Sequence, residues 1–276
     1  SKLEIIFCVF LAKNNFVNLL IPFIGVRRDE MNRVVIAYEP WVKGGFQLSS
    51  DPVTYEVIRH RLWQINKEQG QTLVNTSGSP VVTEANDFNV VITDNKGEVI
   101  TIGPYIFIHF CGTVNAIKNT LQFYGETGIE EDDMYVSNDP WVTAPHAVDY
   151  TLIAPVHYQG KLVTFVGSTL HMIDAGGPWP GAWCIGARSA FEEQPRFRYL
   201  RIMEKGQLRK EVMETIKCNC RLPDRNELDL KAMIAAAQVA KERLHKLFEH
   251  YGLEVVAKVM EDMINVSDMS LRKRLI

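Results

Sequence analysis

The chain has 276 residues, of which 46% are hydrophobic and 23% are charged, as is ordinary for a globular protein with a sizeable core. Its 30 lysines and arginines are outnumbered by 33 aspartates and glutamates, and the net charge of −3 gives no support for nucleic-acid binding. The five cysteines are too few and too unevenly spaced for a disulfide framework, so we expect a reduced, cytoplasmic setting.

The N-terminal segment, residues 1–30, carries apolar runs that are interrupted at Lys13 and followed by basic residues at Arg27 and Arg28. A spanning helix needs about twenty uninterrupted apolar residues, and a signal peptide has its basic residues first, so the pattern predicts neither. We expect translation to begin at Met31, with residues 1–30 as upstream read-through. The predicted organisation is an N-terminal extension over residues 1–50 and one main domain over residues 51–276.

The first part of the main domain is predicted to be a helix followed by short strands. Asp51 is a capping acid before Pro52, and the apolar spacing that follows predicts a helix that ends near Gly70. A second helix is expected from Gly112 through Leu121. Short β-branched runs predict strands at 81–82, 90–92, 99–100 and 134–136, the middle two joined as a hairpin by a turn at 94–97.

The clearest pair of strands is 150–156 and 162–170, joined by a turn at 159–160. Residues 175–196 are rich in glycine and proline and predict a long loop, which in compact domains is often functional. The last third is helical: Asp224 and Glu227 have the spacing of a capping box, and Gly252 separates two helices. The predicted class is α+β, with a mixed β-sheet middle containing antiparallel hairpins, flanking helices and a helical C-terminal part.

Three side chains stand out at one end of the predicted hairpin: His146 and Asp149 at its entry and His171 at its exit. Entry and exit of an antiparallel hairpin meet at the same end, so the three can converge. Two imidazoles and one carboxylate leave coordination positions open, as in catalytic iron, zinc and manganese sites. The sequence therefore predicts a divalent metal site. Two partly buried histidines and an ordinary aspartate at a strand start are the alternative interpretation.

Other polar residues near this end of the hairpin are candidates for supporting roles. His109 and Asp174 are predicted to be catalytic, although a buried structural histidine before a helix is an equally good interpretation of His109. Trp179 and Trp183, in the long loop, either cover the site or pack in a core or an interface. Hydrogen bonds to the two imidazoles are expected from Asn138, Asp139 and Asp174.

An ordered series of motifs resembles the hydantoinase B/oxoprolinase family, from about residue 51 to residue 266. The central motifs are Asn138-Asp139-Pro140, His146-x-x-Asp149, Pro155-Val156 and the run from His171 to Gly177. Further matches are Asp51-Pro52-Val53, the run from Ile106 to His109, and the run from Cys220 to Asp224. Each motif alone is weak, whereas their order is specific.

The resemblance implies a metal held by His146, Asp149 and His171, as in the alpha subunit of acetone carboxylase. Manganese is the first choice, with zinc or iron as alternatives. By the same resemblance, ATP is expected on a separate hydantoinase A-type subunit, and this chain has no Gly-x4-Gly-Lys-Ser/Thr loop. Hydantoinase-type members usually have two glycines before the first histidine and a His-His pair later. Thr143-Ala144-Pro145 and Met172 stand there in this chain, and the run His171-Met172-Ile173-Asp174 looks closer to the carboxylase branch, which leaves the substrate open.

The implied function is that of a metal-binding subunit, of which this chain is the N-terminal part, in an ATP-dependent multisubunit enzyme. Such an enzyme either hydrolyses a cyclic amide, such as a hydantoin or 5-oxoproline, or carboxylates a ketone with a small third subunit. It is active only with its partner. A non-catalytic assembly module or an inactive truncated subunit is the alternative. We expect a small-molecule substrate and neither a nucleic-acid nor a membrane partner.

Overall fold

In this computed structural model, the structure describes residues 25–28, 34–37 and 48–275. The chain divides into two compact units, residues 1–47 and residues 48–276. The described part of the first unit is an antiparallel pair of strands, β1 (Gly25–Arg28) and β2 (Val34–Ala37). The predicted translation start at Met31 lies outside the described residues.

The second unit is built on a seven-stranded sheet in the order β4-β3-β7-β6-β5-β8-β9. Every neighbouring pair in it is antiparallel. The strands are β3 (Phe88–Asp94), β4 (Val99–Ile102), β5 (Met134–Ser137), β6 (Asp149–Tyr158), β7 (Lys161–His171), β8 (Leu200–Glu204) and β9 (Gln207–Leu208). The predicted α+β class is confirmed, with a sheet that is antiparallel throughout rather than mixed.

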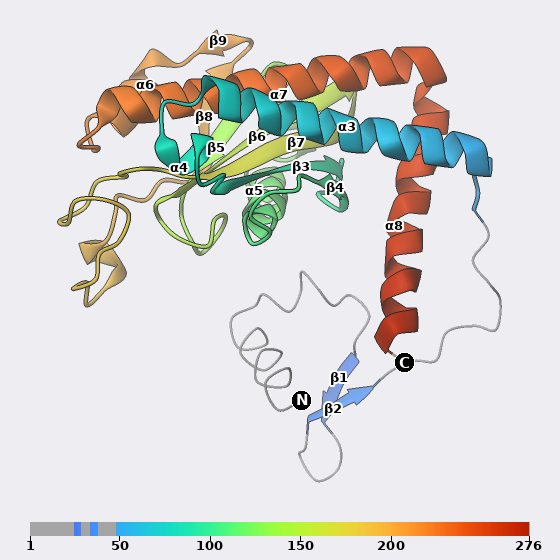
Figure 1. The fold of residues 1–276 in the computed structure, drawn as a ribbon, viewed down its shortest axis with the longest axis horizontal. Helices are drawn as coiled ribbons and strands as arrows, with labels where there is room; N and C mark the ends of the chain where they lie inside the picture. Colours follow the sequence, from blue (N-terminus) through green and yellow to red (C-terminus); the bar gives the residue numbers. More distant parts are fainter. Residues whose placement is uncertain (1–24, 29–33, 38–47, 276) are drawn as a thin grey trace. The chain divides into compact units, whose positions relative to one another are not determined.

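Helices cover both faces of this sheet. Figure 1 shows α3 and α7 side by side on one face and α5 against the other. The helices are α3 (Pro52–Thr76), α4 (Pro80–Thr83), α5 (His109–Tyr124), α6 (Lys210–Lys217), α7 (Pro223–Tyr251) and α8 (Leu253–Leu275), with short 3-10 turns at Glu126–Gly128 and Ala190–Glu192. Among the described residues, no helix has the length and apolar character needed to cross a membrane.

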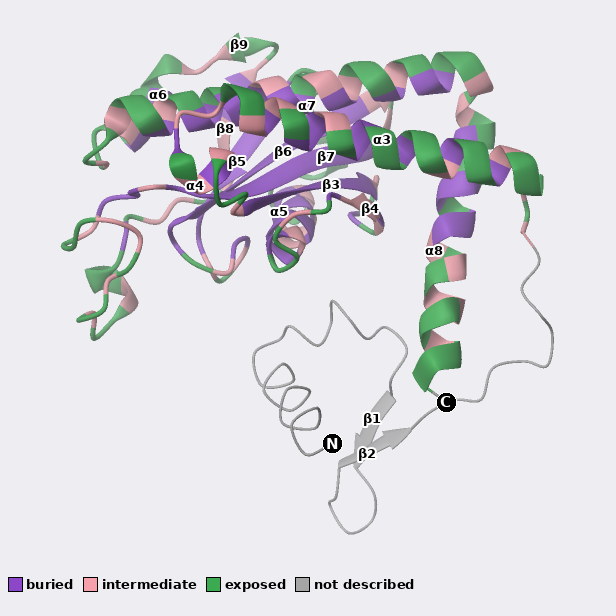
Figure 2. Ribbon diagram, in the orientation of Figure 1, coloured by how far each residue is buried: buried purple, intermediate pink, exposed green. Residues whose placement is uncertain are grey.

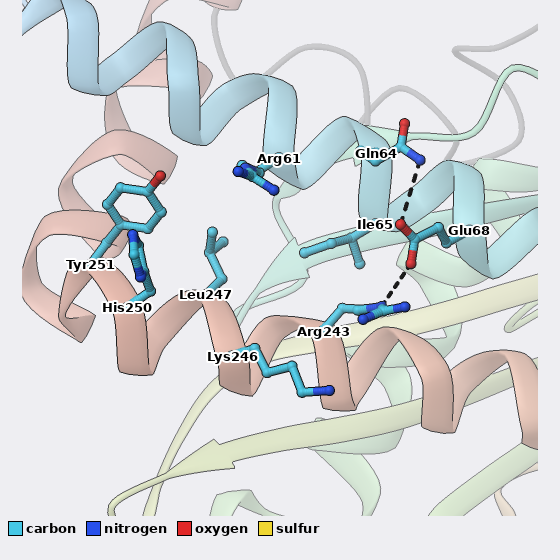
Figure 3. Close-up of a pocket in the computed structure, with 9 residues that line it drawn as sticks. All are labelled: Arg61, Gln64, Ile65, Glu68, Arg243, Lys246, Leu247, His250 and Tyr251. Carbon is cyan, nitrogen blue, oxygen red and sulfur yellow. Dashed lines mark hydrogen bonds and ion pairs between the residues drawn. The ribbon is translucent and has the colours of Figure 1, made fainter.

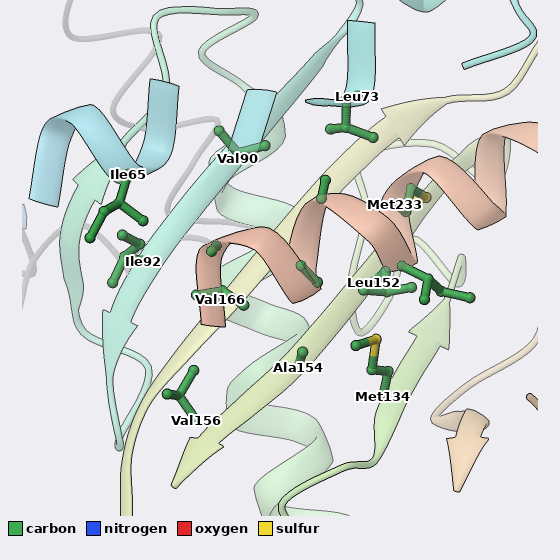
Figure 4. Packing of buried hydrophobic residues seen from close by; sticks show 14 of the residues in the cluster. Ile65, Leu73, Val90, Ile92, Met134, Leu152, Ala154, Val156, Val166 and Met233 are labelled. Carbon is green, nitrogen blue, oxygen red and sulfur yellow. The ribbon is translucent and has the colours of Figure 1, made fainter. Parts of the chain in front are cut away.

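The strand alternation divides the core into two layers. Leu152 and Ala154 on β6 belong to the large cluster under α3 and α7, whereas Ile153 between them belongs to the smaller cluster under α5. Figure 2 shows the central strands and the inner sides of α3 and α7 as buried, and Figure 4 shows side chains of the large cluster gathered between the sheet and the helices. Because both faces are covered, the central strands β6 and β7 are buried along most of their length.

The β6–β7 hairpin is the element that positions the candidate site. Its turn uses Gln159 and Gly160, both with positive φ, of 53° and 76°. The resulting register pairs Leu152 with Ser168 and, at the far end, Asp149 with His171. The predicted hairpin is therefore confirmed, and its open end lies where β6 begins and β7 ends.

Three local predictions are wrong, each for a physical reason. The valines at 81–82 lie in α4 because the Ser79 side chain accepts a hydrogen bond from the Val81 N–H at 3.2 Å and starts a helical turn. The first helix continues past Gly70 to Thr76, because this glycine lies against the Tyr105 ring, which leaves no room for a Cβ.

The third wrong prediction is the capping box at the start of α7. Leu222 occupies the N-cap position without a side-chain hydrogen bond. Glu227 instead forms ion pairs with Lys217 at 2.5 Å and with Lys231 at 2.7 Å. The helix starts at Pro223, whose missing N–H costs nothing in the first turn. The stop at Gly252 is confirmed, with φ of 82°.

Candidate metal centre

The β6–β7 hairpin brings the three predicted ligands together at its open end. Asp149 is the first residue of β6, and it pairs across the ladder with His171, the last residue of β7. A tight turn places His146 beside them, since the Asp149 N–H donates to the His146 carbonyl oxygen at 3.1 Å. One donor atom from each of the three side chains lies within 4.8 Å of the others.

Asp149 is the centre of this cluster. Its side chain is fully buried, and its Oδ1 lies 2.7 Å from His171 Nδ1 while its Oδ2 lies 2.9 Å from His146 Nδ1. Oδ2 also accepts the backbone N–H of His146 at 3.1 Å. The His171 side chain is nearly buried, at 11% exposure, whereas that of His146 is 45% exposed. The cluster is therefore closed on the sheet side and open at His146.

The carboxylate charge of Asp149 is held by its neighbours. Burial raises the pKa of this carboxyl group, but the hydrogen bonds from His146 and His171 outweigh the burial and leave the pKa at about 2. The same hydrogen bond from His146 raises the pKa of that imidazole. At neutral pH the centre therefore presents a buried anion between two imidazoles.

The spacing of the donor atoms fits a first-row divalent ion. Two donors that each lie about 2.1 Å from one ion at a right angle are about 3.0 Å from each other. The two nitrogen–oxygen separations in the cluster, 2.7 and 2.9 Å, are hydrogen-bond lengths that also lie close to that value. Among the described residues, this is the only group of three or more His, Cys, Asp or Glu side chains whose donor atoms gather in this way.

Asp174, predicted to be catalytic and to hydrogen-bond an imidazole, has other partners. Its buried carboxylate accepts the backbone N–H groups of Gly176 at 2.8 Å and Gly181 at 2.9 Å, and it pairs with Arg221 at 3.2 Å. Burial raises the pKa of Asp174, but these bonds hold it below its ordinary value. The bonds fold the beginning of the long loop back on itself, so the geometry favours a positioning role for Asp174.

His109, the other predicted catalytic residue, is the first residue of α5 and is buried. Its Nε2 lies 2.8 Å from the Asp87 carboxylate, and its buried Nδ1 has no partner. The His109 imidazole is among the groups that lower the pKa of Asp149, after the hydrogen bonds from His146 and His171, so it lies within electrostatic reach of the cluster. Its catalytic role stays a prediction.

Asp87 is a residue that the sequence analysis missed. It precedes β3, and its carbonyl oxygen accepts the backbone N–H of His171 at 3.0 Å. Its side chain, 35% exposed, reaches His109. The residue follows a turn and belongs to none of the quoted motifs. Only the pairing of β3 with β7, which sets Phe88 opposite Leu170, brings it to the site.

Asn138 and Asp139 were expected to bond the imidazoles, but they organise the surrounding loops instead. Asn138 Nδ2 donates to the Ala147 carbonyl oxygen at 2.7 Å and to that of Pro195 at 2.9 Å. Asp139 accepts the Trp141 N–H at 2.9 Å, and its other oxygen binds Arg198 at 2.7 Å. These residues therefore connect the loop that carries His146 to the end of the long loop.

The two loop tryptophans have different surroundings. The Trp183 ring contacts His146 with centroids 4.9 Å apart and His171 with centroids 5.8 Å apart. The Trp179 ring lies against Gly186 in the same loop, 3.1 Å from where a Cβ on that glycine would stand. Of the two, Trp183 is the one that covers part of the candidate centre.

A second hollow, of about 390 Å³, lies between α3 and α7 and is drawn in Figure 3. Arg243 crosses it to Glu68 at 2.7 Å, and Lys246 is paired with Glu242 at 2.6 Å. Two of the basic side chains that line this hollow are thus held in ion pairs. The hairpin end, with its convergent donor atoms, is the stronger candidate for chemistry.

Comparison with known proteins identifies a matching family and similar proteins. The family model described as hydantoinase B/oxoprolinase matches residues 51–276. The caprolactamase subunit beta of Pseudomonas jessenii is 31% identical over 222 residues, which cover 80% of this chain and 38% of that subunit. The chain therefore spans less than half the length of this relative.

Two solved structures share the fold. The crystal structure of the ATP-dependent caprolactamase from Pseudomonas jessenii matches with a TM-score of 0.76 and 28% identity, covering 82% of this chain and 39% of that chain. A nucleotide-free acetone carboxylase matches with a TM-score of 0.74 and 22% identity, covering 77% of this chain and 28% of that chain. At that identity the second likeness supports the fold alone.

Proposed function

Because the chain belongs to the hydantoinase B/oxoprolinase family, we propose that it forms the metal-binding part of an ATP-dependent enzyme that hydrolyses cyclic amides. The single observation that carries this proposal is the convergence of His146, Asp149 and His171 at the end of the β6–β7 hairpin. Cyclic-amide hydrolysis is proposed ahead of ketone carboxylation on the strength of the 31% identity to the caprolactamase subunit.

The proposed roles follow from the geometry of the three side chains. Asp149 is ionised and buried, and its two oxygens lie beside the Nδ1 atoms of the two imidazoles, so that one of them would bind the ion together with the imidazole nitrogens. His146 is the most exposed of the three and forms the side that is open to substrate. A bound manganese, zinc or iron ion would supply Lewis-acid chemistry by polarising the amide carbonyl, a contribution of several kcal/mol.

In this proposal, Asp174 and His109 support the site without binding the ion. Asp174 anchors the start of the long loop through Gly176, Gly181 and Arg221 and thereby sets the wall of the site. The His109–Asp87 pair holds the segment whose backbone oxygen binds the His171 N–H. The unpartnered Nδ1 of His109 is the atom through which this imidazole would take part in catalysis.

The activity is proposed to need a partner. The caprolactamase relative is named as a subunit, and the matching structure is titled as ATP-dependent. This chain has no phosphate-binding Gly-x4-Gly-Lys loop of its own. We therefore place ATP on a hydantoinase A-type partner, whose part is to activate the amide before it reaches the hairpin end. A small third subunit belongs to the carboxylase branch and is not part of this proposal.

The experiment is a metal analysis of the purified chain by mass spectrometry after dialysis. We expect about one manganese, zinc or iron ion per chain. The variant His171→Ala should lose the ion while its circular dichroism spectrum is unchanged. The matched control is His60→Ala, since the His60 side chain is 67% exposed on α3 and pairs with Glu56 rather than with a residue of the cluster. This control should keep the ion.

Two results would count against the proposal. If the ion stayed bound in the His171→Ala variant, the cluster would not be its site. If the complete complex turned over a lactam at the same rate without any ion, the cluster would be structural, and the non-catalytic assembly module would be the better account of the chain.

A further inference from the structure

The hollow of about 390 Å³ between α3 and α7 is lined from both helices at regular spacing. Its wall includes side chains three or four residues apart on facing stripes of the two helices. On α3 these are Arg61, Ile65 and Glu68, and on α7 they are Arg243, Leu247 and His250 (Figure 3). The volume lies in the lower part of the roughly 300–1,000 Å³ that is usual for small-molecule sites. The hollow therefore has the size of a ligand site.

One end of this hollow is electrically neutral. Arg243 pairs with Glu68 at 2.7 Å. Lys246 pairs with Glu242 at 2.6 Å. Arg243 uses only its Nε atom in the ion pair, so its two Nη groups have no hydrogen-bond partner among the described residues. This end therefore offers N–H donors without a net charge, which suits uncharged acceptors such as hydroxyl groups.

The other end of the hollow holds a cation without a partner. Glu68 pairs with Arg243, and α3 and α7 run in opposite directions (Figure 1). Two turns away on each helix, Arg61 and His250 therefore face each other, beside Tyr251 (Figure 3). Arg61 forms no hydrogen bond or ion pair with any residue that the structure describes. Its charge is therefore available to a ligand.

Nothing in the lining offsets the charge of Arg61. Glu68, the only carboxylate among the described lining residues, lies at the neutral end and is paired with Arg243. The helix dipoles also give no strong negative field, because α7 ends at Tyr251 and α8 begins at Leu253. The negative end of one dipole thus adjoins the positive end of the next. The Arg61 end of the hollow is therefore basic.

The donors around Arg61 are matched by an oxyanion. The guanidinium presents a planar fork of N–H groups, and the Tyr251 hydroxyl and a ring N–H of His250 can donate beside it. None of these three side chains has a hydrogen bond or ion pair within the described part of the chain. Donors from several directions fit the tetrahedral oxygens of a phosphate better than the two coplanar oxygens of a carboxylate. This end is therefore suited to a phosphate group.

The middle of the hollow is apolar. Ile65 and Leu247, each 6% exposed, form its floor. A bare phosphate ion next to Arg61 would leave this floor, and the free N–H groups of Arg243, to water. A carbon body with hydroxyl groups would cover the floor and accept hydrogen bonds from those N–H groups. The hollow as a whole therefore fits a phosphate that is attached to an organic body.

This hollow is separate from the candidate metal centre. Tyr158, the last residue of β6, packs on Phe248 of α7 with ring centroids 5.4 Å apart, so the hollow lies towards the turn of the hairpin. Asp149 is the first residue of the same strand, which has 10 residues. At about 3.3 Å per residue, the two ends of β6 are roughly 30 Å apart. A ligand in the hollow would therefore not touch the proposed metal ligands.

We propose that the hollow between α3 and α7 is a second ligand site, which binds an organic monophosphate such as a nucleoside or sugar monophosphate. The phosphate lies at Arg61, His250 and Tyr251, and the hydroxyl-bearing body lies over the apolar floor. The site goes beyond the proposed hydrolysis, because it neither contacts the metal cluster nor depends on it.

The test measures the binding of AMP to the 276-residue chain by isothermal titration calorimetry. A chelator in the buffer keeps the metal centre free of ions that could bind the phosphate. AMP should bind, and Arg61→Gln should weaken it at least about tenfold through the loss of charge-assisted bonds. The matched control is Arg59→Gln, which should keep the affinity. Arg59 is also on α3, but it pairs with Glu56 at 2.7 Å and does not line the hollow.

A second variant and two further probes test the geometry of the site. Tyr251→Phe removes one hydroxyl and keeps the ring, and it should weaken AMP about tenfold. Inorganic phosphate should bind more weakly than AMP, because it lacks the body that covers the floor. Adenosine, which lacks the phosphate, should bind more weakly still.

Four outcomes would overturn the inference. The first is no detectable binding of AMP. The second is an equal loss of affinity in Arg59→Gln and Arg61→Gln, which would indicate a diffuse effect of surface charge. The third is adenosine binding as tightly as AMP, and the fourth is inorganic phosphate binding as tightly as AMP. None of these results would affect the proposed metal centre, whose test is the metal analysis.

Discussion

Replacing Asp174 by asparagine should loosen the wall of the candidate site without removing any of its proposed metal ligands. The carboxylate is 2% exposed and uses both oxygens: Oδ1 accepts the Gly176 N–H at 2.8 Å, and Oδ2 accepts the Gly181 N–H at 2.9 Å. Arg221 Nη1 approaches the same two oxygens at 3.3 and 3.2 Å. An amide has one oxygen, so its NH2 group would face one of these N–H donors.

The magnitude follows from the bonds that are lost. A hydrogen bond to a charged group contributes about 1.5–3 kcal/mol, and a neutral one about 0.5–1.5 kcal/mol. Asp174→Asn loses one charged bond outright and makes another neutral. The Arg221 pair is discounted because that side chain is 39% exposed. We expect a loss of about 2–4 kcal/mol, confined in large part to the loop.

The assay combines urea unfolding with hydrogen exchange. The free energy of unfolding should fall, and exchange should accelerate over residues 175–197. Glu98→Gln is the control, since Glu98 forms an exposed pair with Lys118 at 2.8 Å and its loss should cost less than about 1 kcal/mol. A change below that limit in Asp174→Asn, with unchanged exchange in the loop, would refute the anchoring role.

Three further predictions test the surrounding structure. The bonds to Asp174 lower its pKa, so the free energy of unfolding that this carboxylate contributes should be complete above about pH 4, the unfolded value. This contribution should be lost as the pH falls through the folded pKa. Urea titrations of wild type and Asp174→Asn should therefore converge at acid pH. Gly70→Ala should destabilise the chain by about 1–3 kcal/mol in urea, because its Cβ would overlap the Tyr105 ring, and unchanged or increased stability would show that the ring moves freely. Burial raises the pKa of the Cys111 thiol to about 11, so at pH 8 a thiol reagent should label the exposed Cys218 first, and Cys111 labelling as fast as Cys218 in the native chain would contradict the described burial.

The hairpin could be predicted from the sequence because its signals are local. Turn residues at 159–160 and flanking apolar runs determine which residues face each other, and His171 then falls opposite Asp149. The closeness of Asp149 and His171 followed from that register, and the tight turn before β6 adds His146. Their role as ligands stays a prediction until a metal is measured.

What could not be predicted depends on contacts between distant segments. Asp174 is bound by Arg221, 47 residues away, and nothing in the pattern around either residue indicates the pair. Asp87 reaches the site through the pairing of β3 with β7. Gly70 was predicted to lie at a helix end, because its packing against Tyr105 is a tertiary contact that the local sequence does not show. In each case, local propensity is overridden by a partner that only the folded chain supplies.

The central claim is that His146, Asp149 and His171 bind one divalent cation. The most direct measurement is a crystal of the Mn²⁺-loaded chain examined at the manganese absorption edge. The account predicts one anomalous peak per chain, about 2.0–2.2 Å from a nitrogen of each imidazole and from an oxygen of Asp149. A peak at other residues would contradict it. So would a map in which the protein is fully ordered and no peak lies between the two imidazoles.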